Sequence, residues 1–264
     1  MNIIQEVNKL KNKGYNEANA IARLSQDIVL LAISNSSMNK NVTIKGGVVM
    51  RSISKNERRA TQDIDFDFIK YSINDKDIDR FVLKLNNIDG ITIKRVGKIQ
   101  DLKHQDYNGK RIIIEISDGL TTINSKVDIG VHNLLDVRQE EYCFDVCFND
   151  ENISLLINSY EQMVAEKLKS LLRFGARSTR YKDVFDIYYL LPLTNNNRLQ
   201  EIVSGYIYED STLDVNNKEE LIERIKRTFS NDGFIKNIEK SDKNWLELDI
   251  GIVTRKIVQE LSDK

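Results

Sequence analysis

The stretch that decides the fold is TQDIDFDFIKY, residues 61–71, in which acidic and apolar side chains alternate. A period of two predicts a β-strand, because successive side chains point to opposite faces of a sheet. One face carries Asp63, Asp65 and Asp67, and the other carries Ile64, Phe66 and Phe68. Like charges this close on one face repel each other, so such a face is expected chiefly where a cation binds. A solvated acidic sheet face is the alternative interpretation.

The flanking sequence predicts a mixed sheet with helices. Apolar residues recur at helical spacing from the start of the chain to about Ser34, and Gly14 is expected to divide this helix. The segment VTI (42–44) predicts a strand that leads into Gly46–Gly47, and VVMRSI (48–53) predicts a helix after them. Beyond a predicted helix near 77–86, alternating runs predict three more strands: ITIKRVGKI (91–99), RIIIEIS (111–117) and KVDIGVH (126–132).

The chain changes in character after ISLLI (153–157). The segments SYEQMVAEKLKSLLRF (159–174) and YKDVFDIYYLL (181–191) have helical spacing, and Pro192 is expected to end the second helix. We therefore predict an α+β chain with two domains. Residues 1–158 form a mixed β-sheet with flanking helices, and residues 159–264 form a mainly α-helical domain.

The composition narrows the class of protein. The 264 residues, 41% hydrophobic, are enough for a sizeable core. The formal net charge of −1 gives no overall positive field for nucleic acid or an anionic membrane, although a local basic patch is compatible with it. No apolar run reaches the roughly 18 residues that span a bilayer. The first twenty residues lack the order of a signal peptide, so we expect a cytoplasmic protein.

The two cysteines give no sign of a metal site. Cys143 and Cys147 lie in YCFDVCF (142–148), a predicted strand that would place both sulfurs on one face. Their spacing and neighbours supply no four-ligand zinc set. We expect two reduced, semi-buried thiols.

Two further features indicate a site for a metal ion and a phosphate. Asp128 lies between apolar neighbours in a predicted strand, where a carboxylate needs a bonding partner or a metal ion. The backbone amides of Gly46 and Gly47, at the start of a predicted helix, can approach a phosphate, although such a pair is also common in ordinary turns. Three arginines follow within reach of the same place: Arg51, Arg58 and Arg59.

The predicted helices of the second domain carry another group of charges. Lys167 lies on the apolar stripe of its helix, so its amine either extends to water or meets an anion. Asp183 and Asp186 are three residues apart and share a helix face. Salt bridges between packed helices are the alternative to a functional site here. A local basic surface or a solvated helix face is formed by Lys167, Lys169, Arg173, Arg177, Arg180 and Lys182.

Taken in order, these motifs resemble the AbiEii/AbiGii toxin family, a branch of the polymerase-β-like nucleotidyltransferases. The glycine pair is followed by RxTxDxD (59–65), a later strand with one aspartate, AEKL (165–168) and RxKDxxD (180–186). The resemblance extends from about Gly46 to Leu191, and the last seventy or so residues carry no motif that we can assign. In one departure, Val48 follows the glycines where Ser or Thr is usual, which removes a hydroxyl near the phosphates.

The resemblance implies a role for each matching position in the sheet domain. Asp63 and Asp65 would be the metal-binding pair. Asp128 would be the third carboxylate of the metal site and would polarise the attacking hydroxyl. Gly46 and Gly47 would hold the triphosphate. His132 shares strand parity with Asp128 and either lines this site or is an ordinary partly buried histidine.

The remaining implied roles concern basic residues and the helical domain. Arg51 and Arg59 would assist in nucleotide binding. Lys167 would contact phosphates from the helical domain, with Lys182 as a further nucleotide-binding residue. Asp183 would be the essential acidic residue of that domain.

The implied function is that of an enzyme, a nucleotidyltransferase that transfers a nucleoside monophosphate from an NTP to an RNA. Mg²⁺ or Mn²⁺ would be the cofactor, and tRNA is the suspected acceptor. The protein would be the toxin of a bacterial type IV toxin–antitoxin (abortive infection) system with an antitoxin encoded nearby. A stable complex is not implied, because that antitoxin usually represses transcription. Two alternatives remain: a small-molecule, antibiotic-type nucleotidyltransferase, and a non-catalytic nucleotide-binding module, which Val48 favours.

Overall fold

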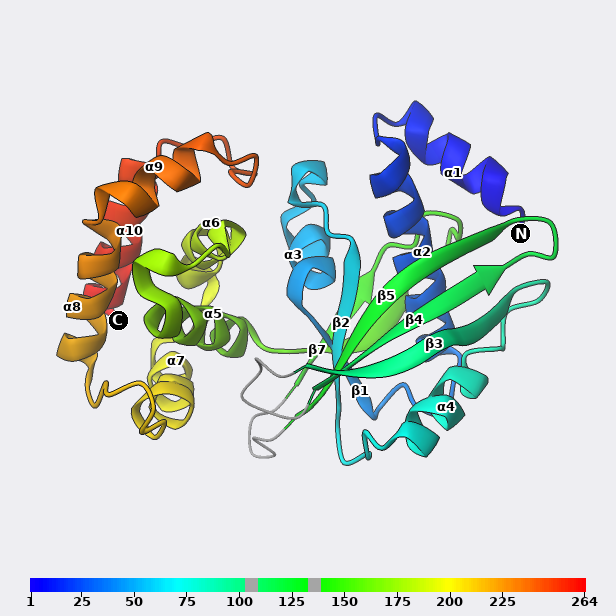
Figure 1. Cartoon of the computed structure of the whole chain (residues 1–264), viewed down its shortest axis with the longest axis horizontal. Helices are drawn as coiled ribbons and strands as arrows, with labels where there is room; N and C mark the ends of the chain where they lie inside the picture. Colours follow the sequence, from blue (N-terminus) through cyan, green and yellow to red (C-terminus); the bar gives the residue numbers. More distant parts are fainter. Residues whose placement is uncertain (103–108, 133–138) are drawn as a thin grey trace. The chain divides into compact units, whose positions relative to one another are not determined.

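The computed structural model describes residues 1–102, 109–132 and 139–264, and its contacts divide the chain into two compact units. Unit 1 is Met1–Asn158 and unit 2 is Ser159–Lys264 (Figure 1). Unit 1 combines a seven-stranded sheet with helices, whereas the elements described in unit 2 are all helical. The predicted α+β fold class is confirmed.

The helices of unit 1 are α1 (Ile3–Asn12), α2 (Glu17–Ser34), α3 (Gly46–Ser54) and α4 (Asp75–Lys84), with a short 3₁₀ helix at Glu57–Arg59. The strands are β1 (Val42–Lys45), β2 (Asp63–Phe68), β3 (Thr92–Leu102), β4 (Gly109–Ser117), β5 (Thr122–Val131), β6 (Glu140–Phe144) and β7 (Ile153–Ile157). Their order in the sheet is β3-β4-β5-β2-β1-β7-β6. The sheet is mixed, because β1 pairs with β7 and β2 with β5 in parallel while the other pairs are antiparallel.

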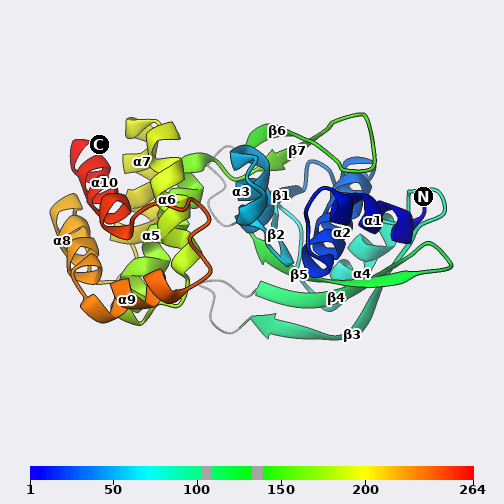
Figure 2. The ribbon, with the colours of Figure 1, turned by 90° about the horizontal axis from the view of Figure 1, so that it is seen from above.

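The apolar face of the predicted acidic strand forms the centre of the core. Phe66 pairs in register with Ile44 on one side and with Ile129 on the other, and none of the three is exposed. Helix α2 packs on this sheet, inside its curve in Figure 2, and touches β2, β5 and β7. Burial of this face therefore fixes the register of β2, since a slip of one residue would turn its aspartates inward.

Local sequence sets the helix boundaries of unit 1. Asn2 and Asn16 cap the first turns of α1 and α2 through their side-chain oxygens, and Asn74 does the same for α4. Gly14, with a φ of 101°, lies in the turn between α1 and α2, which confirms the predicted division there. Helix α3 begins directly after β1 and packs on β1 and β2.

Unit 2 is built from α5 (Tyr160–Phe174), α6 (Tyr181–Leu190), α7 (Asn196–Val203), α8 (Lys218–Phe229), α9 (Asp232–Lys240) and α10 (Ile250–Asp263). Helix α5 packs against α6, α7 and α8, and α10 covers α6 and α8. Pro192 lies in a 3₁₀ turn directly after α6, as predicted. None of the helices described in either unit is long and apolar enough to cross a membrane.

The prediction for the cysteines is wrong in part. Strand β6 ends at Phe144, so Cys143 lies in the strand and is exposed, whereas Cys147 lies beyond it. The backbone N–H of Cys147 donates to the Asp27 carboxylate at 2.9 Å instead of pairing in the sheet. The alternating sequence extends to Phe148, but the strand ends at Phe144, and the chain beyond it bonds to the buried Asp27.

Candidate active site

The glycine pair lies directly against the acidic strand. Gly46 has a φ of 66°, and a Cβ atom at this position would collide with the Asp65 carboxylate. A Cβ atom at Gly47 would lie 2.5 Å from the Cβ of Thr61. Both close approaches require glycine, and the left-handed φ favours it independently at Gly46. The fold thus brings two motifs that are separate in the sequence into one place.

A row of charged residues crosses four strands on the face opposite the core. In register, Lys45 of β1 lies opposite Asp65 of β2, and Asp65 lies opposite Asp128 of β5. Asp128 in turn lies opposite Arg111 of β4. We call the four aspartates of this face, Asp63, Asp65, Asp67 and Asp128, the acidic strand face.

The aspartates of this face differ in their partners. Asp67, only 2% exposed, forms an ion pair of 2.6 Å with Nζ of Lys45. Asp63 is partly exposed, and its carboxylate has no hydrogen-bond or salt-bridge partner within residues 1–102, 109–132 and 139–264. Asp67, the last aspartate of the DxDxD run, therefore pairs with a neighbouring strand, whereas Asp63, the first, is available to a ligand.

Asp128 is held by an arginine. Nε and Nη2 of Arg111 donate to its two carboxylate oxygens, each at 2.7 Å. These hydrogen bonds to Asp128 raise the pKa of the Arg111 guanidinium above its usual value. The planar fork of arginine matches a carboxylate, so this pair fixes the orientation of Asp128.

The acidic strand face fits a divalent cation in part. Asp63 and Asp65 offer hard oxygen ligands of the kind that Mg²⁺ prefers, at alternate positions of one strand. Both oxygens of Asp128 are bonded to Arg111, and no group of three acidic, histidine or cysteine side chains in the described segments is arranged to hold a metal. The donor chemistry fits an ion held by Asp63 and Asp65 next to the glycine pair.

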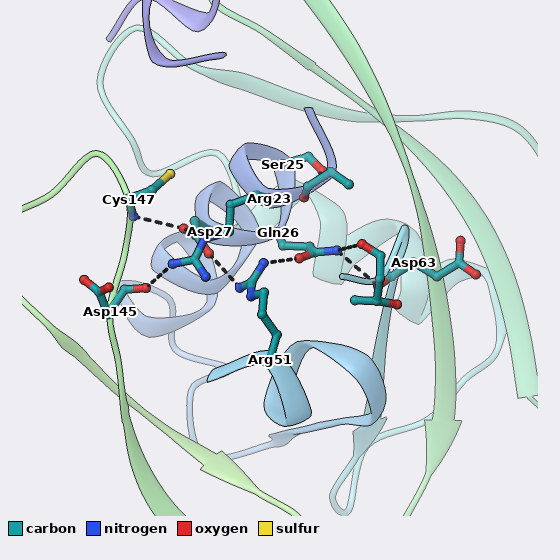
Figure 3. A network of polar contacts seen from close by, with 10 residues as sticks. Arg23, Ser25, Gln26, Asp27, Arg51, Asp63, Asp145 and Cys147 are labelled. Atoms are coloured by element: carbon teal, nitrogen blue, oxygen red, sulfur yellow. Dashed lines mark hydrogen bonds and ion pairs between the residues drawn. The ribbon is translucent and has the colours of Figure 1, made fainter. Parts of the chain in front are cut away.

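Arg51 lies in a buried network rather than on the acidic strand face. Its side chain is 5% exposed and reaches the carbonyl oxygen of the Gln26 side chain at 2.5 Å and the Asp27 carboxylate at 3.1 Å (Figure 3). Burial lowers the pKa of the Arg51 guanidinium, and the Asp27 carboxylate opposes that shift. This arginine, predicted to bind nucleotide, is bonded to α2.

The other predicted residues near the glycine pair are also buried. Val48, in the first turn of α3, is fully buried, so its side chain packs in the core. Arg59 is 4% exposed on its 3₁₀ helix. His132 is 4% exposed, and its Nε2 atom lies 3.1 Å from the side-chain nitrogen of Gln139. The structure therefore pairs His132 with a neighbouring glutamine.

Sequence reasoning missed Gln26 and Asp27 of α2. They lie in ARLSQDIVLLAI (22–33), a helical stretch that is apolar except for Arg23 and these polar residues, and Ser25, Gln26 and Asp27 are all fully buried. Three consecutive polar residues inside an apolar helix were the available signal, because buried polar groups need partners. Asp27 accepts hydrogen bonds from Arg23 at 2.7 Å, Arg51 and the Cys147 backbone.

Within unit 2, the second predicted group comes together around Lys167. Nζ of this buried lysine lies 2.8 Å from both Asp183 and Asp186. Nε1 of Trp245 donates to Asp186 at 3.0 Å, and Arg180 lies 2.8 Å from Asp183. We call Lys167, Arg180, Asp183, Asp186 and Trp245 the lysine cluster.

The neighbouring basic residues of unit 2 are largely paired. Lys169 and Arg173 both bind Asp210, at 2.8 and 3.2 Å, and Lys169 lowers the pKa of the Asp210 carboxyl. Lys182 is partly exposed in the first turn of α6. These ion pairs reduce the positive charge that the cluster of basic residues would present to an RNA.

Comparison with known proteins gives one family. Residues 20–249 match the family described as "Nucleotidyl transferase AbiEii toxin, Type IV TA system". Among curated proteins, no sequence matches the chain.

Solved structures similar to this chain have low sequence identity to it. A candidate nucleotidyltransferase from H. pylori is 16% identical, with a TM-score of 0.47, over 94% of this chain and 98% of that one. JHP933 from Helicobacter pylori is 16% identical, with a TM-score of 0.46, over 94% and 95%. An antigenic nucleotidyltransferase-like protein from Paracoccidioides brasiliensis is 16% identical, with a TM-score of 0.43, over 75% and 92%.

The family match covers the glycine pair, the acidic strand face and the lysine cluster. The chain therefore belongs to the AbiEii family of nucleotidyltransferase toxins.

Proposed function

We propose that this nucleotidyltransferase transfers a nucleoside monophosphate from an NTP to an RNA, with tRNA as the suspected acceptor. It acts as the toxin of a type IV toxin–antitoxin pair whose antitoxin is encoded nearby. The observation that carries the proposal is the close approach of Gly46 to Asp65, with Asp128 directly opposite Asp65 in the sheet. This arrangement supports phosphate and metal binding at one place.

In this proposal, Asp63 and Asp65 hold Mg²⁺ or Mn²⁺, and the turn at Gly46 and Gly47 receives the triphosphate. The backbone amides at the start of α3 would donate to the phosphates, and the two glycines add no side chain of their own there. The bound ion would neutralise charge on the nucleotide phosphates. Val48 contributes no hydroxyl, so backbone amides carry this part of the binding.

Asp128 orients the attacking hydroxyl of the acceptor. Arg111 supports this role by holding both carboxylate oxygens in one orientation. The protein then positions its substrates and stabilises charge, which is the greater part of catalysis in phosphoryl transfer. In unit 2, Lys167 and Asp183 are the residues to which the family resemblance assigns a part in catalysis, and Lys182 is assigned to nucleotide binding.

The proposal is tested by incubating the protein with Mg²⁺, total cellular RNA and each of the four α-labelled NTPs, followed by a denaturing gel. Asp65→Asn is run beside it, with Asp89→Asn as the matched control, because Asp89 is an exposed aspartate outside the acidic strand face. We expect a labelled RNA band with the wild type and the control, and none with Asp65→Asn. No label in RNA with any NTP, or equal labelling by Asp65→Asn, would overturn the proposal.

Expression in cells tests the toxin assignment separately. Wild-type protein should arrest growth, and Asp65→Asn should not. Growth arrest by both proteins at equal levels would show that nucleotide transfer is not the cause.

A further inference from the structure

Gln26 of α2 connects the two motifs of the proposed site, the acidic strand and the helix that follows the glycine pair. Its side-chain nitrogen donates to the backbone oxygen of Thr61 at 2.8 Å and lies 3.5 Å from that of Asp63. Its side-chain oxygen accepts from Arg51 at 2.5 Å. Asp63 is the first residue of β2 and Thr61 lies two residues before it, whereas Arg51 belongs to α3, the helix that starts at the glycine pair.

The chemistry of this connection requires an amide. The Arg51 guanidinium can only donate hydrogen bonds, and the two backbone oxygens can only accept them. A glutamine side chain has both an acceptor and a donor, so it can join the two groups in one orientation. Gln26 is fully buried, which leaves no water to replace either bond.

Asp27 anchors the same network. It binds Arg51 at 3.1 Å and Arg23 at 2.7 Å, and Arg23 also donates to the backbone oxygen of Asp145 (Figure 3). Two arginines thus share one carboxylate, and the network includes α2, α3 and the loop after β6. Figure 3 shows the Asp63 carboxylate pointing away from this network, so Gln26 bonds its backbone and leaves its side chain available.

We propose that Gln26 is a positioning residue: through Thr61, Asp63 and Arg51 it fixes the Asp63 carboxylate relative to the Gly46–Gly47 turn for metal and nucleotide binding. The inference rests on the proposed function in taking Asp63 as a metal ligand. It also gives Arg51 a new part, since this arginine acts through Gln26 on the site without touching the nucleotide. A displacement of about 1 Å at such a ligand can reduce turnover about 100-fold.

Gln26→Glu separates positioning from stability. A carboxylate keeps the bond to Arg51 and balances the charge of two arginines against one aspartate, so we expect an unchanged or higher thermal midpoint. It has no N–H for the Thr61 oxygen, so the start of β2 loses its support. Added negative charge would by itself strengthen cation binding, so weaker binding could only come from lost geometry.

The test measures Mn²⁺ binding by the full chain, using the electron paramagnetic resonance signal of free Mn²⁺, together with the thermal midpoint. Gln26→Glu and Gln26→Met are compared with Ser25→Ala. Ser25 is the matched control, because it is equally buried in α2 and, among the residues that the structure describes, its hydroxyl bonds within its own helix, to the backbone oxygen of Ala22. We expect both Gln26 variants to bind Mn²⁺ at least about tenfold more weakly than wild type, and Ser25→Ala to bind normally.

RNA labelling adds a second measurement. Where the wild type labels RNA, both Gln26 variants should show a lower kcat and need more Mg²⁺ for half-maximal rate. Weaker Mn²⁺ binding by the variants without RNA labelling by the wild type would overturn the proposed function and support the inference. Equal Mn²⁺ binding by wild type and Gln26→Glu, or no Mn²⁺ binding by the wild type, would overturn the inference, whatever the RNA result.

Discussion

The acidic strand face and the lysine cluster both contain aspartates and basic residues, but they differ in how far their charges are paired within the protein. In the lysine cluster, one buried amine lies 2.8 Å from each of two carboxylates, and the indole of Trp245 binds one of them as well. On the acidic strand face, Asp67 and Asp128 are paired with Lys45 and Arg111, while Asp63 has no such partner among the described residues. One group is electrically satisfied within the protein, and the other can accept a further cation.

This difference predicts which property a substitution changes. Removing one of the two proposed metal ligands of the acidic strand face, Asp63 or Asp65, should affect activity more than stability. Removing a charge from the lysine cluster leaves buried partners uncompensated and should affect stability strongly. The following predictions would break or sharpen this comparison.

The largest effect is expected for Asp65→Asn. Loss of a metal ligand should reduce nucleotide transfer by about 10³-fold or more, since an ion at such a site contributes several kcal/mol to the transition state. The thermal midpoint should change little by comparison, because asparagine keeps the size and the polar character of the side chain. Single-turnover transfer and circular dichroism measure the two properties. Transfer at the wild-type rate by the folded variant would contradict a metal-binding role for Asp65.

Lys167→Met should have the largest effect on stability. It leaves Asp183 and Asp186 without their shared cation, which should lower the free energy of unfolding by about 3–5 kcal/mol. Trp245, the only tryptophan, bonds to Asp186 and reports the change by fluorescence during urea unfolding. Lys236→Met, at an exposed lysine of unit 2, is the matched control and should leave the transition in place. An unshifted transition in Lys167→Met would show that the cluster is not structural.

Gly46→Ala should reduce both nucleotide transfer and thermal stability, each by a smaller amount. A φ of 66° strains an L-residue by about 1–2 kcal/mol, and the new methyl group would push against Asp65. Gly90→Ala is the matched control, because Gly90 has a φ of 73° with nothing within 4 Å of an added Cβ atom. We expect the loss of thermal stability to be at least as large in Gly46→Ala as in Gly90→Ala, and a loss of nucleotide transfer only in Gly46→Ala. Equal transfer by both would separate Gly46 from the site.

The smallest effect concerns Asp210, which Lys169 and Arg173 share. Lys169 lowers the pKa of this carboxyl below its ordinary 3.8, so its contribution is present above that pH and is lost as pH falls through the lowered pKa. Asp210→Asn should therefore lose about 1 kcal/mol at neutral pH and much less in acid. Urea unfolding from neutral pH to well below pH 3.8 measures this. A constant difference between wild type and variant across that range would contradict an ion-pair contribution.

The sequence predicts the helices and strands of this protein better than it predicts the bonding partners of their charged side chains. Alternation identified β2, and helical spacing identified α5 and α6, because both patterns are local consequences of burial on one face. Asp67 shares the parity of Asp65, yet only the fold shows that Lys45 neutralises it from the next strand.

Partners distant in sequence account for the rest of what was missed. Arg51 was predicted to bind nucleotide because it follows the glycine pair closely, but it bonds to Gln26 and Asp27 on a helix more than twenty residues earlier. Nothing periodic relates these positions. Arg111 likewise belongs to no motif. Its role becomes visible only in the sheet, where Arg111 of β4 lies opposite Asp128 of β5.

The parallel pairing of β1 with β7, in which Thr43 lies opposite Leu156, has a consequence during protein synthesis. During synthesis the glycine pair and the DxDxD run leave the ribosome early. Asp128 follows much later, and β7, which pairs with β1, is the last strand of the sheet to appear. Because such distant pairings form slowly and late, a growing chain carries separate parts of the site long before it carries an assembled one. A chain terminated before Asp128 has no strand to lie opposite Asp65, so a prematurely ended toxin should be harmless to the cell that is making it.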